Sequence, residues 1–216
     1  MKTLSIPFLP ELELLSAEGA SLLLDDIGTR FSVETLNWPH LFGYKPITFV
    51  SAGHNGSDLY FMYQVHGNCL RAVNTRDNQN VHEDSCVEFF VQVPGSDLYY
   101  NFEFNCSGVC KAARHFGTRD QFEYLTEEER ALIDRHSSIG RRAFNEINGL
   151  FSWELTVKIP LKLLGIQAGM LPKKLLGNFY KCADATSQPH YVSWNPIKTD
   201  KPDFHRPEFF GEIHLV

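Results

Sequence analysis

Strict alternation between apolar and polar residues is the feature that most constrains how this chain folds. The segment DSCVEFFVQV (84–93) places one set of side chains on one face of an extended strand, namely Val87, Phe89, Val91 and Val93. The opposite face carries Cys86, Glu88, Phe90 and Gln92. After the turn sequence PGSD, the segment LYYNFEFNCSG (98–108) puts Phe102 and Phe104 on one side and Asn101, Glu103 and Asn105 on the other. A period of two residues is typical of strands, so a β-hairpin is predicted here.

The same alternation recurs along the chain. Strands are predicted at 46–52, 58–67, 69–74 and 150–160, and shorter strands at 175–185, 190–194 and 209–216. The sequence contains no repeat, low-complexity segment or linker rich in Gly, Ser or Pro. Many short strands separated by turn signals favour a β-sandwich. We therefore expect residues 1–216 to form a single all-β domain.

Helical signals are few. A short helix is predicted at 16–28, with Ser16 as its N-cap and Gly28 at its end. A second helix is predicted within LTEEERALIDRHSS (125–138), where Thr126 and Glu129 form a capping box. A brief helical turn is expected at PLKLLGI (160–166). These segments predict one or two short helical insertions in the sandwich.

Charge and cysteine content exclude some classes of protein. The net charge is −6 and no basic stripe is present, which argues against a nucleic-acid partner. No apolar stretch has the length of a membrane span, and prolines and glutamates interrupt the N-terminal segment. Five cysteines, an odd number, favour reduced thiols, so we expect a cytoplasmic protein unless an upstream segment directs export. Cys106 and Cys110 have the spacing of half a metal site, but no second pair accompanies them, so packed free thiols are the favoured interpretation.

The polar faces of the predicted hairpin suggest a binding site. If the two strands are neighbours, their polar residues lie together, and planar carboxylate, amide and guanidinium groups can bond adjacent sugar hydroxyls. Aromatic residues of the loop WNPIKTDKPDFHRPEFFG (194–211) are expected to approach this face. The candidate ligand-binding residues are Arg71, Glu88, Asn101, Glu103, Asn105, Trp194, Phe204 and His205.

An interpretation without a ligand explains the same residues. Glu88, Glu103 and Arg71 can form an ion-pair network beneath a loop that closes the sandwich. Trp194 fits either the core or the rim of a site. Trp153 alternates with apolar residues and is predicted to lie in the core, while Trp38 is expected to pack the N-terminal crossing over the sandwich. Both interpretations remain open from the sequence.

Six motifs follow one another along the chain, namely NWPHLFGYKPITF, LRAVN, EDSCVEFFVQ, YYNFEFNCSG, WELTVKIPLKLLG and SWNPIKTDKPDFHRPEFFGEIHL. In this order they resemble the family 9 carbohydrate-binding modules, and more narrowly their stand-alone bacterial relatives. Together they cover roughly residues 30 to 216. The resemblance implies a jelly-roll-type β-sandwich, non-catalytic binding of a mono- or oligosaccharide, and bound calcium, as in well-known members.

Some of the family's sugar-binding positions hold different residues in this sequence. The two tryptophans that clamp a sugar in the family fall near Val81 or His82 and near Phe204 or His205, and neither position is Trp. The family glutamate matches Glu88, whereas the family arginine falls at Glu103. The site is thus expected to keep one ligand group and to replace a positive donor with a carboxylate.

Three alternatives concern an enzyme, a metal and a partner. Glu88 and Glu103 are a candidate pair for glycoside hydrolysis, although nothing distinguishes an acid from a nucleophile. No His-Glu-x-x-His or Gly-x-Ser-x-Gly motif indicates another hydrolase. RDNQN (76–80) offers oxygen ligands for calcium but lacks the spacing of a known calcium loop. A protein-interaction module is the remaining hypothesis.

Overall fold

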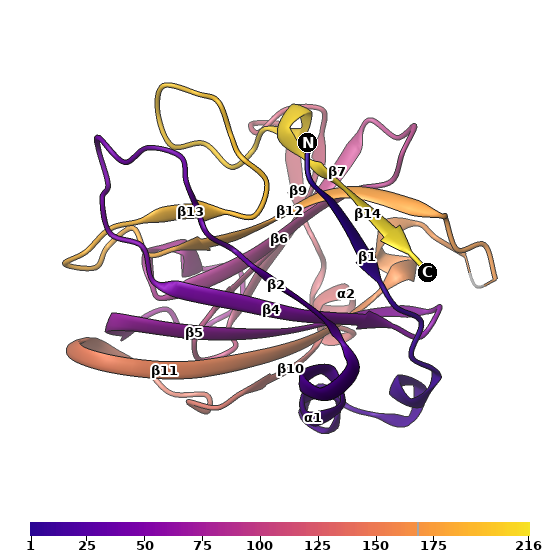
Figure 1. The fold of residues 1–216 in the computed structure, drawn as a ribbon, viewed down its shortest axis with the longest axis horizontal. Helices are drawn as coiled ribbons and strands as arrows, with labels where there is room; N and C mark the ends of the chain where they lie inside the picture. Colours follow the sequence, from indigo (N-terminus) through magenta and orange to yellow (C-terminus); the bar gives the residue numbers. More distant parts are fainter. Residues whose placement is uncertain (168) are drawn as a thin grey trace.

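Two stacked β-sheets make up most of the protein in the computed structural model, which describes residues 1–167 and 169–216 (Figure 1). Within these residues the first sheet has nine strands and the second has five. The nine-stranded sheet contains β1 (Thr3–Ile6), β3 (Thr35–Leu36), β6 (Cys86–Gln92), β7 (Leu98–Asn105), β8 (Cys110–Phe116), β9 (Phe122–Tyr124), β12 (Lys174–Cys182), β13 (Tyr191–Ser193) and β14 (Gly211–Leu215). The five-stranded sheet contains β2 (Thr29–Ser32), β4 (Ile47–His54), β5 (Asp58–Ala72), β10 (Asp134–Ser137) and β11 (Phe144–Pro160).

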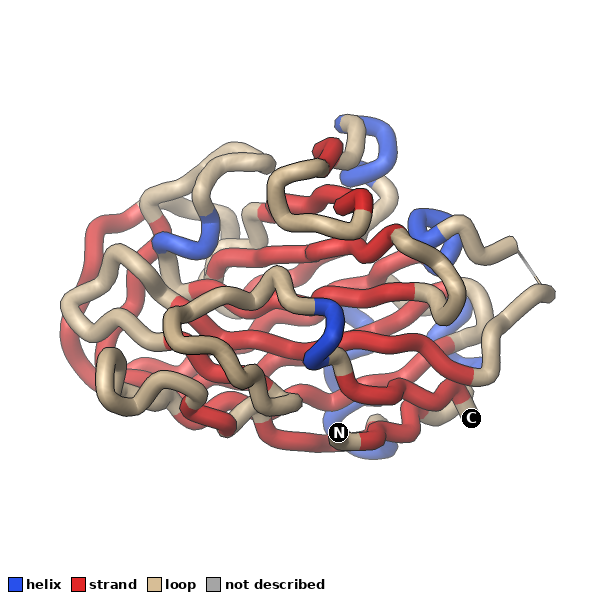
Figure 2. The backbone as a smooth tube through the Cα atoms, turned by 90° about the horizontal axis from the view of Figure 1, so that it is seen from above, coloured by secondary structure: helices blue, strands red, loops and turns tan. Residues whose placement is uncertain are grey.

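The strand order matches a sandwich rather than a chain of simple hairpins. The larger sheet runs β1-β14-β12-β6-β7-β8-β9, with β13 beside β12 and β3 beside β13, and the smaller runs β10-β11-β5-β4-β2. Seen from above, the helical segments are short and lie in the connections between strands (Figure 2). They are α1 (Ala17–Ile27), α2 (Glu127–Ala131) and the 3-10 turns η1 (Pro10–Leu14), η2 (Val81–Glu83), η3 (Leu161–Leu164) and η4 (Pro207–Phe209). The predicted jelly-roll-type β-sandwich with short helical insertions is confirmed.

The core lies between the two sheets because each strand turns its apolar face inward. Its members run from Leu4 to Leu215 in the sequence, so both ends of the chain contribute to it. Rings of Phe61, Phe89 and Phe179 meet at its centre with centroids 4.6–5.1 Å apart. Burial of this apolar surface is the main favourable contribution to folding. A second apolar cluster, around Trp38 and Tyr180, lies on the outer face of the nine-stranded sheet.

The predicted hairpin is confirmed in its register. β6 and β7 are antiparallel neighbours, with Glu88 directly opposite Glu103 and Phe90 opposite Asn101. Val87, Phe89 and Val91 enter the core between the sheets. The residues that alternate with them therefore face away from the five-stranded sheet.

Three local predictions need comment. Helix α1 has Ser16 as its N-cap and Gly28 as its C-cap, as predicted. The helix predicted within 125–138 is present as α2, with the capping box of Thr126 and Glu129, but it ends at Ala131, and residues 134–137 form β10 instead of continuing it. Pairing with β11 overrides the helical pattern there. Residues 58–67 and 69–74 are not separate strands, because β5 continues to Ala72 along β11.

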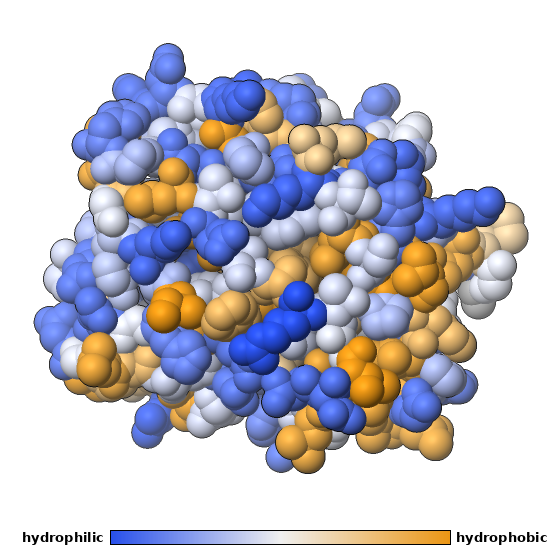
Figure 3. Space-filling model, in the orientation of Figure 1, coloured by the Kyte–Doolittle hydropathy of each residue, from blue (hydrophilic) through white to orange (hydrophobic). Residues whose placement is uncertain are grey.

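The surface is mixed in polarity on the face shown in Figure 3. Hydrophilic side chains cover most of it, with apolar ones interspersed. Exposed apolar side chains include Leu14 at the end of η1 and Leu22 on α1. None of the helices in the described part of the chain is long and apolar enough to cross a lipid bilayer.

Candidate functional site

A cavity of about 170 Å³ opens on the outer face of the nine-stranded sheet. Strands β6, β7, β8 and β12 supply its floor, which consists of Glu88, Phe90, Glu103, Lys111 and Cys182. Connections between strands supply its rim, which consists of His82, Arg119, Asp184 and residues 202–205, with Tyr191 from β13. The predicted polar face of the hairpin and the aromatic 194–211 loop thus meet at one concave site.

Glu103 is one of the two buried carboxylates on the floor of the cavity. Its Oε1 accepts a hydrogen bond of 2.7 Å from Asn101 Nδ2. Its Oε2 is buried and has no hydrogen-bond partner among the described residues. This oxygen lies 3.5 Å from His82 Nδ1 and 3.7 Å from Lys111 Nζ. Although burial raises the pKa of Glu103, its interactions with His82 and Lys111 lower it below the ordinary value, so the group is ionised.

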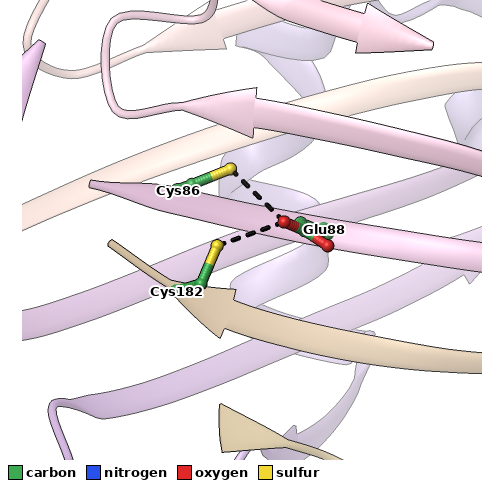
Figure 4. Close-up of side chains that lie close together, drawn as sticks. All are labelled: Cys86, Glu88 and Cys182. Atoms are coloured by element: carbon green, nitrogen blue, oxygen red, sulfur yellow. Dashed lines mark hydrogen bonds between the residues drawn. The ribbon is translucent and has the colours of Figure 1, made fainter. Parts of the chain in front are cut away.

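Glu88 lies beside Glu103 in a different environment. Burial, and then the charge of Glu103, raise the pKa of Glu88 well above its ordinary value. The Cys182 thiol is 3.1 Å from Glu88 Oε1 and the Cys86 thiol is 3.9 Å from the same oxygen. Figure 4 shows both sulfur atoms directed at this carboxylate from β6 and the end of β12. The two neighbouring acids therefore differ in charge state, with Glu103 holding the negative charge.

The loop that covers the site is held by aromatic packing. Phe204 stacks on Tyr180 with ring centroids 4.1 Å apart, and its carbonyl accepts a hydrogen bond from the Tyr180 hydroxyl. His205 Nδ1 lies 3.1 Å from the Tyr99 hydroxyl. Burial, and then the nearby His115, lower the pKa of His205 to about 3, so this ring is neutral. These contacts fix Phe204 and His205 at the rim before any ligand arrives.

The structure brings together five of the eight candidate residues. Glu88, Glu103, Phe204 and His205 line the cavity. Asn101 lies one position along the same strand face, where it bonds Glu103 and lines an adjoining hollow with His115. Whether these residues bind a ligand stays a prediction.

Arg71, Asn105 and Trp194 lie elsewhere. Arg71 donates a 2.6 Å hydrogen bond to Asp84, so its predicted pairing with Glu88 and Glu103 is wrong. Asn105 also donates to Asp84, at 2.9 Å. Trp194 is buried between the sheets, against Phe31, and not at the rim. The physical reason is topology, because Arg71 belongs to the other sheet and Trp194 points to the opposite face from the cavity.

Several residues of the cavity were not predicted as ligand-binding residues from the sequence. Lys111 lies opposite Glu103 on β8, and an extended alternation over CKAARHF would have placed it on the polar face. His82 sits on η2, at the position where the resemblance located the first family tryptophan. No local sequence pattern marks Asp184 or Tyr191 as a cavity residue, because Asp184 reaches the rim from the turn after β12 and Tyr191 from the start of β13.

The loop at 76–80 does not fit calcium. Both carboxylate oxygens of Asp77 accept hydrogen bonds from Arg135, at 3.0 and 3.1 Å. The Cys110 backbone N–H donates to the same side chain. A cation would have to displace the guanidinium, so the predicted oxygen ligands are already used. A different group, Cys86, Glu88 and Cys182, has its ligand atoms within 4.8 Å of one another, and all three side chains are buried.

Comparisons with known proteins bear on the family and the fold of the chain. The sequence profile described as Carbohydrate-binding family 9 matches residues 19–215. A crystal structure of a candidate carbohydrate-binding protein from Bacteroides uniformis is 34% identical, with a TM-score of 0.92, covering 100% of this chain and 99% of that one. A search of the curated proteins finds no match.

Two more distant structures share the fold. A family 9 module from Caldicellulosiruptor kristjanssonii in complex with glucose is 9% identical, with a TM-score of 0.65, covering 100% of this chain and 96% of that one. A structure of a family 9 module from the same organism in complex with cellotriose is 9% identical, with a TM-score of 0.59, covering 99% of this chain and 93% of that one. At this identity the likeness concerns the fold alone.

Proposed function

Because the chain belongs to carbohydrate-binding family 9, we propose that the cavity over Glu88 and Glu103 binds a saccharide without altering it. One observation carries the proposal. Two buried carboxylate oxygens of cavity residues, Glu103 Oε2 and Asp184 Oδ1, have no hydrogen-bond partner among the described residues. Buried polar atoms in folded proteins are nearly always satisfied, so these two oxygens await donors. Sugar hydroxyl groups are such donors.

The other residues that line the cavity can donate hydrogen bonds to sugar hydroxyl oxygens and contact the apolar surface of a sugar ring. Lys111 Nζ and His82 Nδ1 lie 3.7 and 3.5 Å from Glu103 Oε2, so one sugar hydroxyl can donate to the carboxylate while a neighbouring hydroxyl accepts from the lysine or the histidine. Tyr191 and Phe204 add aromatic surface at the rim. The cavity is smaller than the cavities of about 300–1,000 Å³ that hold drug-sized ligands. The ligand is therefore a monosaccharide or the end of a short chain, and the related modules with bound glucose and cellotriose support this class.

Binding without hydrolysis follows from the placement of the two acids. A glycoside hydrolase uses carboxylates that flank the scissile bond. Glu88 and Glu103 are directly opposed on neighbouring strands, and both rise from the floor on the same side of a bound sugar. Glu88 is also held by the Cys182 thiol and buried. The pair therefore recognises a ligand from one side, and we assign it no catalytic role.

The test is isothermal titration calorimetry with glucose, cellotriose and a panel of other monosaccharides. We expect at least one sugar to bind with one site per chain, and Lys111→Met to weaken it. Lys162→Met, an exposed change on η3 away from the cavity, serves as the matched control. The same panel as chromogenic glycosides is expected to show no turnover.

Three outcomes would overturn this function. Absence of binding to every sugar would remove saccharide recognition. Turnover that is lost in Glu103→Gln would favour the hydrolase alternative. Stoichiometric binding of a protein through the same face, with no response to sugars, would favour an interaction module.

A further inference from the structure

We propose that Cys86, Cys182 and Glu88 form a binding site for a thiophilic divalent metal ion of the zinc type at the floor of the cavity. The inference does not rest on saccharide binding. It rests on two thiols and one carboxylate brought together by strands that are distant in the sequence. The ligand atoms lie within 4.8 Å of one another (Figure 4).

The distances match a tetrahedral ion. Zinc binds thiolate sulfur at about 2.3 Å and carboxylate oxygen at about 2.0–2.2 Å. Tetrahedral angles then separate sulfur from oxygen by about 3.5 Å and two sulfurs by about 3.8 Å. The two sulfur-to-oxygen distances here are 3.1 Å for Cys182 and 3.9 Å for Cys86, one on each side of that value. Small side-chain rotations are enough to close the shell around an ion.

The sheet holds the three ligands on one face. Cys86 and Cys182 are directly opposite each other where β6 and β12 pair. Glu88 is two residues along β6, so its side chain projects on the same side as Cys86. Ligands on strands are held more precisely than ligands on loops. The site is therefore largely formed before the ion binds.

Charge explains how buried thiols can serve as ligands. Burial raises the pKa of Cys86 to about 12 and that of Cys182 well above its ordinary value, so both are protonated without a metal. An ion would displace the two thiol protons and the proton of Glu88, since metal ligands bind in their deprotonated form. Two thiolates and one carboxylate around a divalent ion leave one net negative charge. The buried Lys181 leaves β12 on the opposite face from Cys182, where it donates to the Cys182 carbonyl at 2.7 Å.

The fourth coordination position opens toward solvent. Cys182 and Glu88 line the cavity, while Cys86 lies fully buried behind them. Three protein ligands with one open position are the arrangement that leaves room for water or another oxygen ligand. An ion held here would therefore present an exchangeable site to the cavity.

The test uses the reduced, metal-free protein titrated with zinc by calorimetry and with cadmium by ultraviolet absorbance. We expect one equivalent of each ion per chain and a thiolate-to-cadmium charge-transfer band. Cys182→Ser is expected to abolish the band, and Glu88→Gln to weaken zinc binding by an order of magnitude or more. Cys69→Ser, which alters a buried free thiol in the other sheet, is the matched control and retains both signals.

A second measurement covers a variant that fails to fold. In the wild-type protein, zinc is expected to protect Cys86 and Cys182 from alkylation, as measured by mass spectrometry of their peptides, while labelling of Cys69 is unchanged. Absence of zinc binding, or stoichiometric binding without protection of these two thiols, would overturn the proposal. Loss of sugar binding in the metal-free protein bears only on the saccharide function and leaves the metal site to be judged by these readouts.

Discussion

Replacing Glu103 with Gln changes one oxygen and one charge at the centre of the cavity. In the wild type, Oε1 is occupied by Asn101 and Oε2 faces His82 and Lys111 without a hydrogen bond from the described residues. A glutamine can keep the bond to Asn101 through its carbonyl. Its amide nitrogen then replaces the free acceptor and turns a donor toward Lys111. The variant therefore removes the proposed contact to a sugar hydroxyl while preserving side-chain volume.

The magnitude follows from the charge on that acceptor. A hydrogen bond to a charged group contributes about 1.5–3 kcal/mol. Since about 1.4 kcal/mol corresponds to a tenfold change in affinity, Glu103→Gln is expected to raise the dissociation constant about 10- to 150-fold. The same change lowers the pKa of His82, because Glu103 is the main cause of its elevated value. It also lowers the pKa of Glu88, whose elevation depends partly on the charge of Glu103.

The assay combines calorimetry with proton NMR titration of the His82 ring. Calorimetry uses whichever sugar binds the wild type, and Glu154→Gln on the exposed face of β11 serves as the control. A dissociation constant within twofold of the wild type, in a variant that remains folded, would refute the role of Glu103. An unchanged His82 pKa would refute the ion pair itself.

Three further predictions concern stability and can be checked by urea denaturation. Glu103 raises the pKa of His82, so protonated His82 stabilises the folded state fully below about pH 6.5, and this stabilisation disappears as the pH rises through the folded-state pKa. The difference in the free energy of unfolding between the wild type and His82→Gln should therefore shrink over that pH interval. Gly211→Ala would place a Cβ atom 2.4 Å from the Trp194 ring, so the free energy of unfolding should fall by about 1–3 kcal/mol, whereas Gly43→Ala, which meets no atom closer than 3.9 Å, should be neutral. Arg71→Ala leaves its buried carboxylate partner without a charge partner, so stability should fall by about 1–3 kcal/mol while sugar affinity stays the same.

The local alternation of apolar and polar residues was sufficient to predict the hairpin at the centre of the site. Alternation is a property of consecutive residues, so the sequence alone placed Glu88, Asn101 and Glu103 on one face opposite the core. Helix α1 was equally predictable from the sequence, because the N-cap side chain bonds to a backbone N–H only a few residues away. The family resemblance, carried by ordered motifs, pointed to the same fold and function class.

The tertiary structure determines which residues surround that face. Arg71 pairs with Asp84 and Trp194 packs in the core, since both contacts depend on which strands are neighbours in the folded protein. Cys86 and Cys182 are nearly a hundred residues apart, and only the pairing of β6 with β12 brings their sulfur atoms to the same carboxylate. Side-chain periodicity reports which face a residue occupies, whereas the partner across that face is set by the order of strands in the sheet.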